Sequence, residues 1–239
     1  MYNDILKEIL SLRNDDKAKQ LARFFKTGKG QYGEGDLFLG ITVPVSRKMA
    51  IKYYNIPLKY VARLIKNKHH EVRLIAILVL VHKYKTSPIP GMGEKKEIVD
   101  FYLAHSKYIN NWDLVDLSAG YILGDYLCKR TVLLQRSILL ALVKSQNIWE
   151  RRIAIISTFA FIFKGKSEWT LKITKILLND NHDLIHKACG WMLREVGKRV
   201  SEKDLTSFLD ANSQKMPRTM LRYAIERLPE KKRLYYLHK

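Results

Sequence analysis

The residues best suited to chemistry lie in one short segment, residues 110–116. In a helix that begins near this segment, Trp112 and Asp116 are four positions apart and therefore lie on one face. Asp113 falls in the first turn, where a carboxylate can cap free N–H groups and complement the helix dipole, so it has a sufficient structural explanation. Asp116 gains less from the helix end. It is therefore the candidate for chemistry that needs a fixed negative charge beside an aromatic ring.

Two further helices place cations beside an indole. These groups are Trp149 with Arg151 and Arg152, and Lys187 with Trp191 and Arg194 at i, i+4 and i+7. Aromatic surfaces interleaved with Arg and Lys suit a nucleic acid, because the cations bind phosphates and the indoles contact sugars or bases. The alternative interpretation is that Trp149 and Trp191 are core residues flanked by solvated charges.

The net charge indicates the kind of partner. The chain has 43 Lys and Arg against 23 Asp and Glu, which gives a formal charge of +20 and an isoelectric point near 9.9. A field of this size attracts polyanions and steers their approach, so nucleic acid is the leading partner. Two alternatives remain, a basic cytoplasmic protein with no polyanion partner and a peripheral membrane binder.

The composition excludes several classes of protein. A hydrophobic fraction of 47% with 28% charged residues is typical of a folded globular chain. The longest nearly apolar stretch, 153–163, is well short of the roughly 20 residues that span a bilayer, and the N-terminus has no secretory signal pattern. We therefore expect a cytoplasmic protein that makes no use of a membrane. Cys128 and Cys189 show no disulfide or zinc spacing and are expected to be reduced thiols.

The positioning elements are all helices. Apolar residues recur at 3, 4 and 7 positions almost from end to end, and sustained two-residue alternation is absent, which predicts an all-α fold. The predicted helices cover 2–13, 16–27, 45–55, 57–67, 70–85, 94–107, 112–128, 131–145, 149–163, 168–178, 182–199, 202–211, 217–228 and 230–237. The predicted breaks fall at Gly28–Gly35, Pro44, Pro57 and Pro88–Gly91.

The helices also repeat. The anchors Ala76, Ala119, Ala154, Ala188 and Ala224 are 43, 35, 34 and 36 residues apart. This degenerate period predicts a HEAT-like solenoid forming one domain, 1–239, with a concave basic face that can follow a duplex. Three positions before the anchor stand Arg73 and Arg151, as cations on that face, whereas Asp116 occupies the same position in the 112–128 helix. A carboxylate there repels phosphate, so the presence of Asp116 at this position calls for a functional explanation.

Several stretches in the same order carry a resemblance to a known family. They are Phe38-Leu39-Gly40-Ile41-x-x-Pro44, Asn111-Trp112-Asp113-Leu114-Val115-Asp116, Leu123-Gly124-Asp125, Asn147-Ile148-Trp149-Glu150-Arg151-Arg152-x-Ala154 and Lys187-Ala188-x-Gly190-Trp191-x-Leu193-Arg194-Glu195. Over most of its length the chain resembles the bacterial AlkD-type alkylpurine DNA glycosylases, which are built of HEAT-like repeats. The resemblance is more specific than any single motif.

The resemblance implies roles for individual residues. Asp116 matches the family's catalytic carboxylate, and Trp112 and Trp191 match its two site tryptophans. Arg152 matches the phosphate-binding arginine, and Arg151, Lys187 and Arg194 are expected to add DNA contacts.

The sequence departs from the family pattern at two places. The stretch 28–36 looks like an insertion relative to familiar members, and Phe24 stands where one of them has a Tyr, so contacts of that hydroxyl are not carried over.

The resemblance also implies a reaction, removal of cationic N3- or N7-alkylated purines from double-stranded DNA in base excision repair. The base leaves as a neutral molecule, so positive charge moves onto the deoxyribose, where a carboxylate at Asp116 would stabilise it. Trp112 and Trp191 can add cation–π attraction. No metal and no nucleotide cofactor is required, and a monomer associated with the bacterial nucleoid is expected. The rivals are a catalytically silent DNA-binding protein and a protein–protein scaffold.

Two other motifs point elsewhere and are set aside. Residues 28–33 fit G-x-G-x-x-G, but neither a preceding strand nor a βαβ unit is visible. His182 and His186 have the i, i+4 spacing of a zinc helix, but no third ligand is evident, so an exposed helix start is the preferred interpretation.

Overall fold

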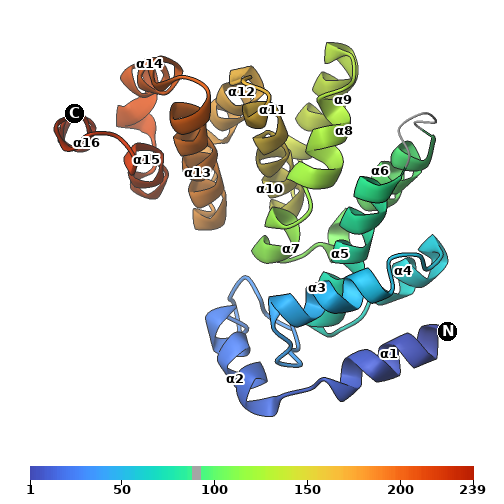
Figure 1. The fold of residues 1–239 in the computed structure, drawn as a ribbon. Helices are drawn as coiled ribbons and strands as arrows, with labels where there is room; N and C mark the ends of the chain where they lie inside the picture. The colour runs from blue at the N-terminus through green and yellow to red at the C-terminus, as the bar shows by residue number, and fades with distance from the viewer. Residues whose placement is uncertain (88–92) are drawn as a thin grey trace. The chain divides into compact units, whose positions relative to one another are not determined.

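The computed structural model describes residues 1–87 and 93–239 (Figure 1), and in these ranges the secondary structure is helical apart from one isolated bridge between Leu37 and His69. The predicted all-α helical-repeat class is thereby confirmed. The chain packs as two compact units, Met1–Ser118 and Ala119–Lys239, each with its own core. The single domain and its concave basic face, which would extend over both units, stay predictions. Within the described ranges, no helix is both long and apolar enough to cross a membrane.

The first unit is organised around one buried helix. Its elements are α1 (Tyr2–Ser11), α2 (Asp15–Phe24), α3 (Val43–Lys52), α4 (Leu58–Leu64), α5 (His70–Thr86), α6 (Gly93–Ala104), the 3₁₀ turn η1 (Ser106–Tyr108) and α7 (Trp112–Asp116). Every residue of α5 from His70 to Val81 is buried, and α3, α4, α6 and α7 pack around it. Since a helix that is apolar nearly all round must be buried, the sequence of α5 makes it the core of this unit.

The second unit has α13 at its centre. Its elements are the π-helical turn η2 (Gly120–Gly124), α8 (Asp125–Leu127), α9 (Val132–Val143), α10 (Ile148–Ser157), α11 (Phe159–Phe163), α12 (Glu168–Ile176), η3 (Leu177–Asn179), α13 (Asp183–Arg199), α14 (Glu202–Asn212), η4 (Ser213–Lys215), α15 (Arg218–Ile225) and α16 (Glu230–His238). The neighbours of α13 include α10, α12, α14 and α15, and its closest partner is α15.

The predicted breaks coincide with helix starts. Pro44 stands in the first turn of α3, and Pro57 is the N-cap of α4, positions at which the missing N–H of proline costs nothing. The stretch 28–35 forms turns between α2 and α3. The predicted break at Pro88–Gly91 lies outside the described residues.

The predicted helix over 112–128 is wrong as one continuous element. The structure divides it into α7, the π-helical turn η2 and α8. A Cβ at Gly124 would stand 2.3 Å from the Ser157 carbonyl oxygen, so this turn is held against the backbone of α10. The Ser118 hydroxyl also donates to the Leu114 carbonyl oxygen at 2.6 Å, a side-chain bond of the kind that bends helices. The interruption follows from close backbone packing at a glycine.

The predicted helix over 149–163 is likewise two helices, α10 and α11, which meet at Thr158. The hydroxyls of Ser157 and Thr158 donate to the carbonyl oxygens of Ile153 and Ile155, both at 2.7 Å. These hydroxyls compete with backbone N–H groups for the same carbonyls, which accounts for the break in an otherwise apolar helix.

A test of the central packing of the second unit uses Gly190. A Cβ at this position would lie 2.5 Å from both the Met220 carbonyl oxygen and the Tyr223 Cβ, because α13 and α15 approach closely there. Gly190→Ala is expected to lower the free energy of unfolding by about 1–3 kcal/mol through overpacking. Gly120→Ala is the matched control, since its Cβ would find only ordinary contacts from 3.6 Å. Equal thermal melting of the two variants would contradict the close approach.

Candidate active site

The short helix α7 presents the two residues that the sequence singled out in the first unit. Asn111 is its N-cap, and its side-chain oxygen accepts a hydrogen bond from the Trp112 N–H at 2.8 Å. Trp112 and Asp116, the first and last residues of α7, are both half-buried. A carboxylate at a C-terminal helix end faces the negative end of the helix dipole. The position of Asp116 therefore brings no stabilisation from the helix.

The charge of Asp116 affects the ionisation of the buried Tyr102 phenol. Burial raises the pKa of Tyr102 above its ordinary range, and the negative charge of Asp116 acts in the same direction. The phenol shares a hydrogen bond of 2.9 Å with the Ser118 hydroxyl, which fixes the segment just after α7. Asp116 thus lies at the border of a dry core, where the effect of a charge is stronger than in water.

An aromatic stack holds the ring of Trp112. The indole stacks on Phe25, with centroids 5.2 Å apart and planes inclined by 17°, and Phe25 in turn stacks on Phe38 at 5.0 Å. Phe24 meets Trp112 edge-on at 6.0 Å and is 63% exposed. Nothing in the sequence indicates these contacts of Phe25 and Phe38, because residues so far apart in the chain show no periodic relation.

A buried ionic cluster lies directly beneath this stack. The Nε2 of His70 lies 2.8 Å from Oδ2 of Asp113, and its Nδ1 lies 3.5 Å from Oδ2 of Asp36. Arg73 Nη2 and Asn111 Nδ2 donate to the two oxygens of Asp36 at 2.6 and 3.0 Å. The cluster joins the segment before α3, the start of α5 and the start of α7.

The charges in the cluster set its protonation. Burial alone would lower the pKa of His70, but the charge and hydrogen bond of Asp113, together with Asp36, outweigh burial and raise the pKa to about 9. Burial likewise opposes ionisation of Asp36, but the imidazolium of His70, whose Nδ1 lies 3.5 Å away, and the charge of Arg73 lower its pKa below the ordinary value. At neutral pH the cluster therefore contains an imidazolium between two carboxylates.

The cluster corrects two expectations from the sequence. Asp113 does cap the helix start, accepting from the Leu114 N–H at 2.8 Å, but it is also the partner of a buried cation. The expectation that Arg73 belongs to a polyanion-binding face is wrong, because its side chain is 4% exposed and bound to Asp36. Arg73 Nη1 also donates to the carbonyl oxygens of Asn67 and Lys68 at 2.9 and 3.2 Å.

The repeat-equivalent Arg151, in α10 of the second unit, has the same kind of surroundings. Its Nη1 donates to the carbonyl oxygens of Ser145 and Gln146, both at 3.0 Å, and its Nε lies 2.6 Å from Asp180 Oδ2. The neighbouring Arg152 is 5% exposed and donates to the Leu184 carbonyl oxygen at 2.5 Å. Both arginines have internal partners, and their roles in DNA binding stay predictions.

The remaining predicted residues lie on α13. Lys187 is paired with Asp183 at 2.7 Å, and Arg194 with Glu226, the C-cap of α15. Trp191 is half-buried and lies 5.7 Å from the ring of Phe159, so it is not a core residue, whereas Trp149 is buried. The predicted site residues therefore fall into two sets, Trp112 and Asp116 in the first unit and the others in the second.

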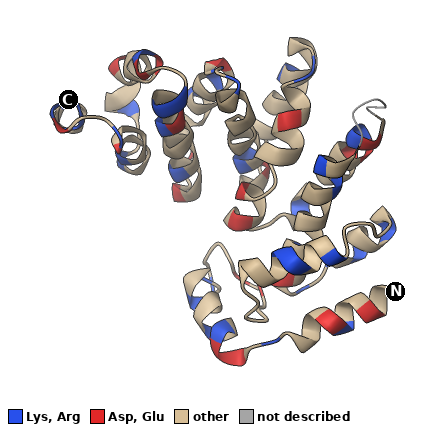
Figure 2. Cartoon of the chain, viewed as in Figure 1, with Lys and Arg blue, Asp and Glu red and all other residues tan. Residues whose placement is uncertain are grey.

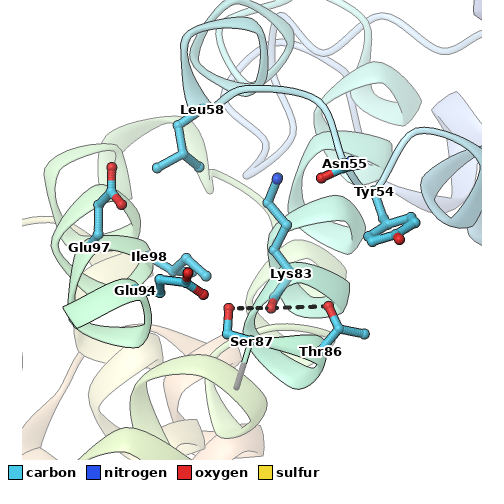
Figure 3. Close-up of a pocket in the computed structure, with 9 residues that line it drawn as sticks. All are labelled: Tyr54, Asn55, Leu58, Lys83, Thr86, Ser87, Glu94, Glu97 and Ile98. Carbon is cyan, nitrogen blue, oxygen red and sulfur yellow. Dashed lines mark hydrogen bonds between the residues drawn. The ribbon is translucent and has the colours of Figure 1, made fainter. Parts of the chain in front are cut away.

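A polar pocket of about 430 Å³ lies elsewhere in the first unit (Figure 3). Lys83 points into it, and burial lowers the pKa of its ammonium group, an effect that Glu97 and Glu94 oppose. The hydroxyls of Ser87 and Thr86 donate to the Lys83 carbonyl oxygen at 2.8 and 3.3 Å and close the end of α5. None of the predicted site residues lines this pocket, so it is not part of the candidate active site.

The two motifs set aside in the sequence have local structural roles. The N–H groups of Gly28 and Gly30 donate to the side chains of Gln31 and Glu34. His182 is the N-cap of α13, and His186 Nε2 donates to the Asp180 carbonyl oxygen at 2.5 Å. Among the described residues, no three His, Cys, Asp or Glu side chains are grouped as metal ligands would be.

The cluster predicts how stability depends on pH. Because the pKa of His70 is raised in the folded state from 6.5 to about 9, its stabilisation is fully present below pH 6.5 and is lost as the pH rises through 9. The loss is expected to be roughly 3 kcal/mol, measured by chemical denaturation between about pH 6 and 10.

His70→Gln and Asp113→Asn should each remove this dependence of stability on pH. Asp113→Asn should cost about 3–5 kcal/mol at pH 6, because it removes the closer of the two carboxylates that hold the buried imidazolium. A wild-type stability that is flat over this range would contradict the charged state of His70.

Comparison with known proteins gives the chain its family. The family model described as "DNA alkylation repair enzyme" matches residues 5–228. No curated protein matches the chain. The solved structure titled "Predicted DNA alkylation repair enzyme from Enterococcus faecalis" is similar in fold, with a TM-score of 0.69 and 16% identity, over 91% of this chain and 97% of that one. Since the family model covers nearly the whole chain, the protein belongs to the DNA alkylation repair enzyme family.

Proposed function

We propose that the protein is a DNA glycosylase that hydrolyses the N-glycosidic bond of cationic N3- and N7-alkylated purines in duplex DNA. The observation that carries the proposal is the place of Asp116, a half-buried carboxylate that ends α7 on the same face as Trp112. Neither the helix dipole nor a DNA-binding surface favours a negative charge at this position. Because the protein belongs to a family of DNA alkylation repair enzymes, a role in catalysis would explain such a carboxylate.

The proposed reaction needs electrostatic stabilisation more than acid–base chemistry. An N-alkylated purine already carries positive charge and departs as a neutral base, so the deoxyribose becomes oxocarbenium-like as the bond breaks. A carboxylate that is held in place at the edge of a dry core stabilises this charge without having to reorganise in the transition state. Asp116 can also orient the water that attacks the sugar. The reaction as proposed uses neither a metal nor a nucleotide cofactor.

The proposed role of Trp112 depends on its rigidity. Phe25 supports one face of the indole, and the N-cap bond to Asn111 fixes its backbone, so the ring needs no reordering when DNA binds. Trp191 has an aromatic neighbour in Phe159, and the guanidinium of Arg199 lies 5.8 Å from the Phe159 ring. In the proposal, each indole can offer a π-face to positive charge on the alkylated DNA. DNA is the partner, and the protein acts as a monomer at the nucleoid.

Asp116→Asn tests the proposed catalysis. The change keeps shape and removes charge, so affinity for undamaged duplex should stay near wild type or rise slightly, because repulsion of phosphate is lost. Single-turnover release of 7-methylguanine from methylated duplex DNA should fall by about 10²–10³-fold, or roughly 3–4 kcal/mol of transition-state stabilisation. Asp100→Asn on α6, which removes an exposed carboxylate, is the control and should keep full activity. Full activity in Asp116→Asn, or loss only through unfolding, would refute the mechanism. If wild type binds duplex but releases no base, the protein is a silent DNA-binding protein instead.

Arg152→Ala tests the proposed phosphate contact separately. The salt dependence of duplex binding should become less steep by about 0.9 in log–log slope, and base release at limiting enzyme should weaken in proportion. Because Arg152 is buried against the Leu184 carbonyl, thermal melting must be measured in parallel, and binding compared at a temperature where both proteins are folded. A folded variant with unchanged affinity and slope would assign Arg152 a purely structural role.

A further inference from the structure

The four cations that the sequence assigned to DNA all have partners within the protein. Arg152 is bound to a carbonyl, Arg151 to Asp180, Lys187 to Asp183 and Arg194 to Glu226. A cation that is already paired contributes less to binding a phosphate, since its own ion pair must first be given up. Most of the positive charge that is available to a polyanion must therefore lie elsewhere on the surface, since the net charge is +20.

One cationic group has no such partners. It consists of Lys17, Lys19 and Arg23 on α2 and Lys26 and Lys29 in the loop that follows, and we name it the α2–loop surface. All five side chains are exposed, and within the part of the chain that the structure describes none takes part in an ion pair. Figure 2 shows basic residues along α2, with acidic residues confined to its N-terminal turn, where Asp15 and Asp16 complement the helix dipole.

The loop that carries Lys26 and Lys29 has a defined shape. Gly33 N–H donates to the Lys26 carbonyl oxygen at 3.2 Å, and a Cβ at Gly33 would lie 2.4 Å from the Phe25 carbonyl oxygen, so the loop closes tightly onto the end of α2. The N–H groups of Gly28 and Gly30 are taken by side chains of the loop. The loop therefore presents the side chains of Lys26 and Lys29 to anions from a closed backbone turn.

Both ends of this loop are attached to the elements that hold α7. At its start, the exposed ring of Phe24 lies 6.0 Å from Trp112. At its end, Asp36 enters the buried cluster with His70 and Arg73. The residues that follow donate three backbone N–H groups to the Glu71 carboxylate at 2.8–3.2 Å. The α2–loop surface is thus joined to the elements that hold Trp112 and α7.

We propose that the α2–loop surface is a contact surface for the phosphate backbone of the DNA that flanks the lesion, and that its lysines bind without regard to sequence. The proposal rests on the proposed function, which makes duplex DNA the substrate. The chemistry favours DNA over a membrane, because Phe24 is the one large apolar side chain that α2 exposes among its cations, which is too little for an apolar stripe that enters lipid. An exposed aromatic side chain flanked in the sequence by exposed cations, as Phe24 is by Arg23 and Lys26, is typical of a nucleic-acid surface.

The test compares two double variants with the same spacing and charge change. Lys26→Ala/Lys29→Ala removes two loop cations, whereas Lys172→Ala/Lys175→Ala removes two exposed cations of α12 in the other unit. Affinity for an undamaged duplex is measured by fluorescence anisotropy as a function of salt. If both loop lysines meet phosphates, the log–log slope should become less steep by about 1.8 in the loop variant and stay near wild type in the α12 variant.

The same proteins are tested on methylated duplex at limiting enzyme, where base release should fall with affinity in the loop variant and not in the α12 variant. If wild type neither binds duplex nor releases base, the proposed function fails. If wild type does both and the loop variant retains its slope and affinity, the α2–loop surface is not a DNA contact. An equal loss of slope in both variants would also overturn the proposal, since it would show a diffuse charge effect. The proposal would also be overturned if the loop variant lost binding to vesicles of phosphatidylglycerol while its DNA binding was unchanged.

Discussion

The hydrogen-bonded ion pair between His70 and Asp113 is the contact on which the arrangement of the first unit depends. It joins α5, the buried core helix, to α7, the short helix that carries Trp112 and Asp116. Five residues of helix cannot hold their own position, because isolated helices this short are unstable in water. Burying a charge is costly unless it is fully partnered, so the pair persists only with Asp36 and Arg73 completing a balanced set of two anions and two cations. The same set makes the position of α7 specific.

The arginines show that positive charge in this protein has two separate uses. Arg73 and Arg151 stand at the same repeat position, and each donates to the carbonyl oxygens five and six residues before it and to an aspartate from another segment. Five donors in a rigid planar group suit this task, which a lysine could not perform. These arginines close the loop before a repeat helix. In the proposal, exposed lysines such as those of the α2–loop surface supply the contacts with polyanions.

The candidate site combines a rigid support with an accessible face. Trp112 is stacked on Phe25 and capped by Asn111, yet it and Asp116 stay half-exposed. An electrostatic catalyst benefits from this arrangement, because the group that stabilises the transition state must not move when charge develops. The α2–loop surface is joined to the same support through Phe24 and Asp36. Binding of the DNA backbone and placement of the reacting carboxylate would then depend on one cluster of buried contacts.

Local pattern in the sequence was sufficient for the helices, their order and the family. Apolar periodicity predicts nearly every helix within a few residues, and the four-residue spacing alone places Trp112 and Asp116 on one face, because both are properties of neighbouring residues. Only the tertiary structure decided which charges are buried. His70, the partner of Asp113, is 43 residues away, and nothing in the local pattern separates it from exposed histidines. The break at η2 was decided in the same way, since Gly124 meets the backbone of Ser157, far along the chain. Ion pairing and close packing depend on which distant segments come together, and a single sequence contains no periodicity that records this.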